Sequence, residues 1–145
     1  DLARPGAGAL AVGLAQSALD EAGSFAKERQ QFNQPIIAFQ AVQHMLADMA
    51  TKLEAARALV YSVARYIDTG AKDFTKYAAM AKLFASECAV KVTGIACQIH
   101  GGSGFMRDKP IERFYRDARI FTVYEGTSEV QRMLIARTLA GASHR

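Results

Sequence analysis

Apolar residues recur at spacings of three and four along most of this chain, which is the period of an amphipathic helix. The clearest run extends from Val42 to Ile67, and Gly70 is placed to end that helix. A first helix is predicted to begin near Pro5, which suits a first helical turn, and to run to about Gln31. Two long helices are therefore predicted before residue 71.

A third long helix is predicted after residue 73, ending at the glycine pair Gly101 and Gly102. Its inward stripe is expected to consist of seven apolar residues. These are Tyr77, Met80, Phe84, Cys88, Val92, Ile95 and Ile99. Leu10 is expected to lie on the inner side of the first helix in the same way.

The remaining chain predicts shorter elements. Pro110 is placed to start a short helix, and a last helix is capped by Thr127 or Gly126. Residues 120–124 favour a strand by composition, but no second strand is available, so we expect an extended connection. The prediction is an all-α fold: one up-and-down helical bundle over residues 1–145, with three long helices followed by shorter C-terminal helices.

Composition and charge narrow the classes of function. The chain has 145 residues, half of them hydrophobic, and a formal net charge of +4. The basic residues form no stripe with stacking aromatics, so nucleic acid is not predicted as a partner. No apolar run is long enough to span a bilayer. The cysteines, Cys88 and Cys97, lie roughly 13 Å apart along one predicted helix, too far for a disulfide, and favour a reducing compartment. The histidines show no metal-ligand spacing, so no metal site is predicted.

Three short stretches can carry chemistry. Glu125 is a carboxylate directly before a helix start, where Gly126 permits a turn or close approach by a ligand. The alternative is that Glu125 only complements the helix dipole. Gly101 and Gly102 can accept a phosphate-bearing or planar ligand, or simply end a helix. Arg29 can pair with a pyrophosphate, or be a solvated side chain near a helix end.

Taken in order, these stretches resemble one family over nearly the whole chain, the C-terminal helical domain of the acyl-CoA dehydrogenases. The matching segments are Asp1–Pro5, Ala18–Ala22, Arg29–Phe32, Gln40–Gln43, Leu46–Ala50, Gln98–Gly102, Arg116–Arg119 and Tyr124–Arg132. Three positions, Gln31, Asn33 and Glu129, depart from the residues that are commoner in the family.

The resemblance implies residue roles that spacing alone does not give. Glu125 is implied as the catalytic base that removes a proton from the substrate. Asp1, Arg4 and Gly126 are implied to contact the substrate, the first two at its CoA part. The implied FAD contacts are Arg29, Gln31, Phe32, Gln40, Gln98, Ile99, His100, Gly101, Gly102, Thr127, Ser128 and Glu129. Several of them are expected to reach an FAD held by a neighbouring subunit.

The resemblance also implies a reaction and partners. Members oxidise an acyl-CoA to the 2,3-enoyl-CoA with FAD, are usually homotetramers, and pass electrons to an acceptor such as electron-transfer flavoprotein. We expect the N-terminal helical domain and the middle β domain of the family to be absent from this chain, and a bacterial cytoplasmic or mitochondrial matrix location. The alternatives are an acyl-CoA oxidase or flavin monooxygenase on the same fold, or a non-catalytic helical interaction module.

Overall fold

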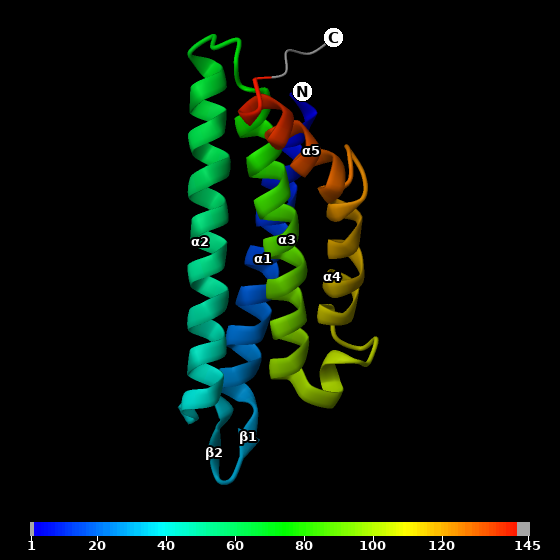
Figure 1. The fold of residues 1–145 in the computed structure, drawn as a ribbon. Helices are drawn as coiled ribbons and strands as arrows, with labels where there is room; N and C mark the ends of the chain where they lie inside the picture. Colours follow the sequence, from blue (N-terminus) through cyan, green and yellow to red (C-terminus); the bar gives the residue numbers. More distant parts are fainter. Residues whose placement is uncertain (1, 142–145) are drawn as a thin grey trace.

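The polypeptide folds into three long antiparallel helices with two shorter helices packed beside them (Figure 1). A computed structural model describes residues 2–141. The long helices are α1 (Ala3–Glu28), α2 (Gln40–Asp68) and α3 (Thr75–His100), and the shorter ones are α4 (Ile111–Ala118) and α5 (Ser128–Leu139). The predicted all-α bundle is confirmed.

Short elements join the helices. The first helix ends at Glu28, three residues before the predicted end, because a short β-hairpin with strands of two residues follows it. Its strands, β1 (Gln30–Gln31) and β2 (Gln34–Pro35), pair antiparallel around Phe32 and Asn33, which both have positive φ. Three 3-10 turns complete the connections: η1 (Ile36–Ala38), η2 (Gly101–Gly104) and η3 (Arg119–Thr122).

The third helix is the central element, because it packs against α1, α2, α4 and α5. Its buried face differs from the predicted stripe, since Tyr77 and Phe84 are exposed. The residues that face the neighbouring helices are mostly small: Ala78, Ala81, Ala85, Ala89, Val92 and Ala96. Alanine lets helix axes approach closely, so the larger apolar side chains lie outside this contact. The prediction for Leu10 was wrong for the same reason, because alanines form the buried face of α1.

Residues 120–124 are not extended, contrary to the prediction. The amides of Val123 and Tyr124 both donate to the carbonyl oxygen of Ile120, at 2.9 and 3.0 Å, so the chain continues from α4 as a 3-10 turn. With no partner strand, local hydrogen bonds satisfy the backbone and override the β propensity of these residues. The turn also buries Phe121.

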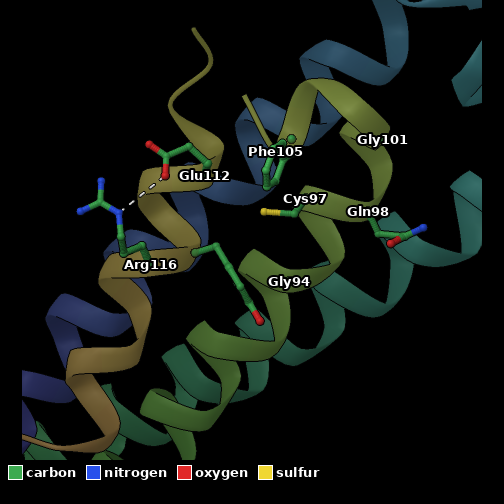
Figure 2. A pocket seen from close by; sticks show the side chains of 9 residues that line it. Gly94, Cys97, Gln98, Gly101, Phe105, Glu112 and Arg116 are labelled. Atoms are coloured by element: carbon green, nitrogen blue, oxygen red, sulfur yellow. Dashed lines mark ion pairs between the residues drawn. The ribbon is translucent and has the colours of Figure 1, made fainter. Parts of the chain in front are cut away.

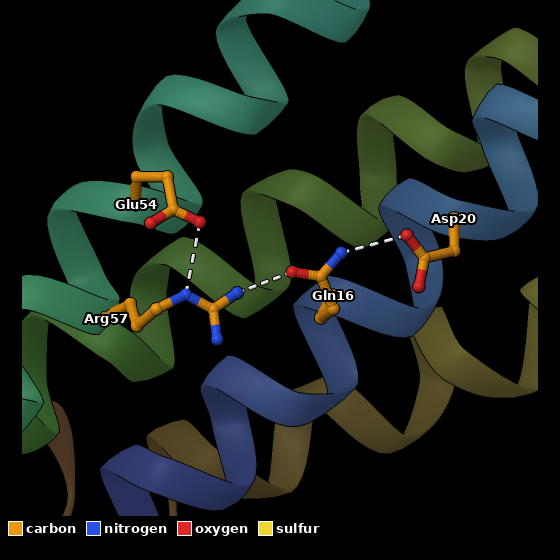
Figure 3. A network of polar contacts seen from close by, with 4 residues as sticks. All are labelled: Gln16, Asp20, Glu54 and Arg57. Atoms are coloured by element: carbon orange, nitrogen blue, oxygen red, sulfur yellow. Dashed lines mark hydrogen bonds and ion pairs between the residues drawn. The ribbon is translucent and has the colours of Figure 1, made fainter.

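A polar network ties the first helix to the second (Figure 3). Arg57 on α2 donates to Gln16 on α1 at 2.5 Å and to Glu54 at 3.1 Å, while Gln16 donates to Asp20 at 2.9 Å. These side chains lie at the edge of the α1–α2 contact. The network links α1 to α2, and exposed pairs of this kind contribute little to the free energy of unfolding.

The cysteines are free, with Cys88 buried and Cys97 half-buried. Burial raises the pKa of the Cys88 thiol to about 11, so the group remains protonated at neutral pH. Within residues 2–141, no helix is long and apolar enough to cross a membrane.

Gly104 is required where η2 folds back on the end of α3. A Cβ atom there would lie 2.5 Å from the carbonyl oxygen of Cys97, and backbone atoms cannot move aside cheaply. We expect Gly104→Ala to lower the free energy of unfolding by about 1–3 kcal/mol, measured by denaturant titration. Gly102→Ala is the matched control, because nothing lies within 4 Å of its added Cβ. Equal stability of the two variants would contradict this packing.

Candidate active site

Glu125 lies in the turn between η3 and α5, with its backbone in the left-handed region at φ 55°. That region is unfavourable for a residue with a side chain and is usually retained only where the surroundings enforce it. The next residue, Gly126, has φ 90°, and a Cβ there would meet the amide nitrogen of Gln131 at 2.6 Å. The turn therefore depends on glycine at 126, and the Glu125 side chain within it is exposed.

Two buried side chains, from α3 and α5, donate hydrogen bonds to this turn, and neither was predicted from the sequence to have a role. Lys82 on α3 donates to the carbonyl oxygen of Phe121 at 2.6 Å and to that of Gly126 at 2.7 Å. Gln131 on α5 donates to the carbonyl oxygens of Glu125 and Gly126 at 3.2 and 3.0 Å. The signal in the sequence was a lysine in phase with the alanines that form the buried face of α3.

The start of α5 carries three predicted site residues. Thr127 is the N-cap, and its hydroxyl accepts from the amide of Val130 at 3.3 Å, which confirms the predicted cap. Ser128 is buried, and its Oγ has no hydrogen-bond partner among the described residues. The pKa of Glu129 is lowered, because its carboxylate accepts from its own backbone amide and from Thr127. All three line a groove of about 300 Å³.

Arg4 lies at the same end of the molecule. Burial lowers the pKa of Lys82, the positive charge of Arg4 lowers it further, and the negative charge of Glu125 raises it. The three charged groups are therefore close enough to interact. Arg4 and Glu125, two of the predicted site residues, both interact with Lys82, whereas Asp1 lies outside the described residues.

A second group of predicted site residues gathers at the opposite end of α3. A groove of about 320 Å³ lies between the end of α1 and the end of α3. Six predicted cofactor contacts line it: Arg29, Gln31, Ile99, His100, Gly101 and Gly102. Phe32, at the hairpin tip, is exposed and stacks edge-on against Phe39, while Gln40 begins α2 near this end.

His100 contributes to this end through packing. Its ring is buried, stacks on Phe25 with centroids 4.3 Å apart, and places Nδ1 2.8 Å from the carbonyl oxygen of Ala96. The ring thus fixes the end of α3 against α1 and sets the position of the glycines that follow.

A third groove, of about 530 Å³, lies between α3 and α4 (Figure 2). Cys97 and Phe105 face it, and an ion pair of 3.6 Å joins Glu112 and Arg116 at its edge. Gln98 and Gly101 also line this groove, and Gly101 borders the second groove as well, so the two grooves meet at the end of α3. Within residues 2–141, no group of three or more His, Cys, Asp or Glu side chains could hold a metal ion.

The structure thus defines a helical bundle with a strained, exposed carboxylate at one end and a glycine-bordered groove at the other. The family model for the C-terminal domain of acyl-CoA dehydrogenase matches residues 1–140. The chain belongs to the acyl-CoA dehydrogenase family, and the resemblance inferred from the sequence is confirmed.

Relatives of known name agree with this assignment. A 3-(aryl)acrylate reductase of Clostridium sporogenes is 54% identical over 94% of this chain and 36% of its own length. The caffeyl-CoA reductase-Etf complex subunit CarC of Acetobacterium woodii is 52% identical over 96% of this chain and 36% of its own length. Butyryl-CoA dehydrogenase from Megasphaera elsdenii superposes with a TM-score of 0.92 at 45% identity, covering 94% of this chain and 36% of that one. The chain therefore spans about a third of the length of these relatives.

Proposed function

We propose that this chain is the C-terminal domain of a flavin-dependent acyl-CoA dehydrogenase and that Glu125 is the base that removes the substrate's α proton. The observation that carries the proposal is the conformation of Glu125. Its backbone is strained, its neighbouring carbonyl groups are held by two buried donors, and its carboxylate remains exposed. Residues held in such strained conformations cluster at active sites and ligand clamps.

The proposed reaction assigns a proton and a hydride to different acceptors. A proton α to a thioester carbonyl is weakly acidic, so the base must be held in line with it as the C–H bond breaks. Glu125 takes that proton, and the electron pair of the broken bond forms the new double bond. FAD, when bound, supplies the acceptor for the hydride that leaves the β carbon. Gly126, beside the base, gives the acyl thioester room to approach.

The residues present fit contacts to a flavin dinucleotide. Ser128 offers a buried hydroxyl that has no partner within residues 2–141, at the start of α5, where free amides and the helix dipole favour polar groups. Arg29 offers a guanidinium beside Gly101 and Gly102, suited to a pyrophosphate. We propose that Thr127 and Glu129 complete the first set of contacts, and that Gln31, Phe32, Gln40, Gln98, Ile99 and His100 belong to the second.

The separation of these sets supports an oligomer. Lys82, beneath the Glu125 turn, and His100, beside the second set, lie roughly 27 Å apart along α3. We propose that the two sets serve the flavins of different subunits, in a homotetramer. Exposed apolar side chains on the long helices, such as Leu10, Tyr61 and Phe84, provide surface for such contacts.

The relatives favour a second candidate, the reverse reaction. Both the C. sporogenes and the A. woodii relatives are named as reductases. In that direction Glu125 would donate the proton that it removes in the forward direction, so the same geometry serves both. We also propose an acyl-CoA or enoyl-CoA substrate and an electron-transfer flavoprotein as the electron partner, as the name of the A. woodii complex suggests for that protein.

A panel of CoA thioesters tests the proposed function. Saturated thioesters are mixed anaerobically with the complete oxidised enzyme, and 2-enoyl thioesters with the reduced enzyme, while the flavin absorbance is followed. A dehydrogenase is bleached by at least one saturated thioester, whereas a reductase is reoxidised faster by an enoyl thioester. Rapid reoxidation by oxygen during turnover would indicate an oxidase. A flavin that responds to no thioester would contradict the proposal.

Arg29→Ala tests the second set of contacts. We expect the variant of the complete enzyme to lose FAD during dialysis, because a charged contact to the pyrophosphate is removed. Enzyme that still holds flavin should react at a near-normal rate. Lys27→Ala is the control, since Lys27 is an exposed cation in the last turn of α1, two residues before Arg29 and outside this groove. An unchanged ratio of flavin to protein in Arg29→Ala would contradict the assignment.

A further inference from the structure

Lys82 is unusual in its burial. Among the residues that the structure describes, it is the one Lys, Arg, Asp or Glu side chain that is buried, with an exposed fraction of 0%. It lies on the face of α3 that is otherwise formed by alanine, as at Ala78, Ala85 and Ala89. Burying an amine is unfavourable unless hydrogen bonds compensate, so the contacts of this side chain must offset that cost.

Those contacts are two carbonyl groups on either side of Glu125. The amine donates to Phe121 at 2.6 Å and to Gly126 at 2.7 Å, so it spans the six-residue segment 121–126 that contains the carboxylate. A single side chain from the central helix thus fixes both ends of the turn. Because α3 packs against four other helices, its position is defined by most of the molecule.

Gln131 holds the same turn from a different helix. Its Nε2 donates to Glu125 and Gly126, at longer distances than those of Lys82. The carbonyl group of Gly126 therefore accepts from both α3 and α5. Left-handed φ at Glu125 is maintained because these bonds would be lost if the turn relaxed.

Electrostatic interactions between charged groups also connect Lys82 to the Glu125 turn. Lys82 interacts with the negative charge of Glu125 and the positive charge of Arg4, and Tyr124 interacts with Glu125. Attraction between the Lys82 amine and the Glu125 carboxylate adds to the hydrogen bonds that hold the turn. Arg4 belongs to α1, so charged groups from α1 and from the turn both act on Lys82.

We propose that Lys82 is a positioning residue for the Glu125 base, because its amine holds the carbonyl groups on both sides of Glu125 and aims the carboxylate at one place. The inference rests on the proposed function and deepens it. Lys82 does not touch the substrate in this account. It acts through the backbone of the turn, so its loss should slow proton removal while flavin and substrate remain bound.

Lys82→Met in the complete enzyme tests the proposal. It keeps an unbranched apolar chain and removes both donated hydrogen bonds. We expect flavin reduction to slow about 10²-fold, because a small misplacement of a base has an effect of that size. The KM and FAD content should change little. The isotope effect with substrate deuterated at the α carbon should increase, because proton removal then limits the rate more completely.

Thr93→Val is the matched control. Thr93 is also fully buried on α3, and its hydroxyl donates to the carbonyl oxygen of Ala89 at 2.7 Å, away from the turn. This variant should keep its rate and its isotope effect within about twofold, so any general effect of losing a buried hydrogen bond on α3 is measured separately.

A double substitution separates positioning from a purely structural role. If Lys82 acts through Glu125, Lys82→Met should slow Glu125→Gln by less than about twofold, because the base is already absent. A further 10²-fold loss in that background, or a normal rate and isotope effect in Lys82→Met alone, would overturn the proposal. If Lys82→Met does not fold, the same comparisons are made with Lys82→Gln, which keeps a shorter donor and should lose less activity. Glu125→Gln alone tests the proposed function. A failure of the proposed role of Glu125 can therefore be distinguished from a failure of the proposed role of Lys82.

Discussion

Replacing Glu125 with Gln in the complete enzyme is expected to slow flavin reduction by an acyl-CoA by roughly 10³-fold or more. Gln keeps the size of the side chain but cannot accept the α proton. The backbone bonds from Lys82 and Gln131 involve carbonyl groups that are unchanged, so the turn should keep its shape. Stopped-flow absorbance of the flavin under anaerobic conditions measures the effect.

Glu112→Gln is the matched control for this substitution. Glu112 is a partly buried carboxylate on α4 that pairs with Arg116 and lies away from the Glu125 turn. The control should reduce its flavin normally. Near-normal reduction by Glu125→Gln, with FAD bound in both variants, would mean that another group removes the proton.

Residues 1–145 produced alone are expected to fold, to self-associate and to contain no FAD. The buried faces of α1, α2 and α3 form one continuous cluster, so the bundle has its own core. Exposed apolar residues, including Leu10, Phe84 and Leu139, should promote association. The contacts proposed for FAD lie in two separate grooves, and each is too small a surface to immobilise the cofactor alone.

Three measurements check this expectation. Circular dichroism should report a helical protein, light scattering a species larger than a monomer, and the absorbance spectrum no flavin. Stoichiometric FAD in the isolated chain would contradict the claim that the flavin needs further domains. A purely monomeric species would contradict the claim that the exposed apolar residues form contacts between subunits.

The helices themselves were predictable because their lengths and turn residues are local properties. Gly70 and Gly101 mark real helix ends, and both have positive φ. The faces were less predictable. The pattern of large apolar residues predicted that Phe84 is buried. In the structure the three long helices pack closely, so alanines form the buried face of α3 and Phe84 is exposed. Which face of a helix is buried depends on how closely the neighbouring helices approach it, and that distance is a property of the tertiary structure.

The residues of the candidate site that belong to a short sequence motif were predictable. The residues that reach the site only through the packing of the helices were not. Glu125 and Thr127 stand in a recognisable stretch before a helix, and the structure places them at that helix start. Lys82 and Gln131 lie 43 residues before and six after Glu125, and only the folded chain brings them to one turn. Lys82 occupies a helical position that, by the spacing of the alanines, belongs to the buried face of α3. That position was a usable signal of a structural role, because a buried charge requires a hydrogen-bond or charge partner.

Exchange of the substrate's α hydrogen tests the central claim most directly. The complete enzyme and Glu125→Gln, both loaded with FAD, are incubated in deuterium oxide with a CoA thioester that binds but is not oxidised, and deuterium at the α carbon is followed by NMR. The account predicts exchange with the unmodified enzyme and none above the uncatalysed rate with Glu125→Gln. Equal exchange with both proteins would contradict the assignment of Glu125 as the base.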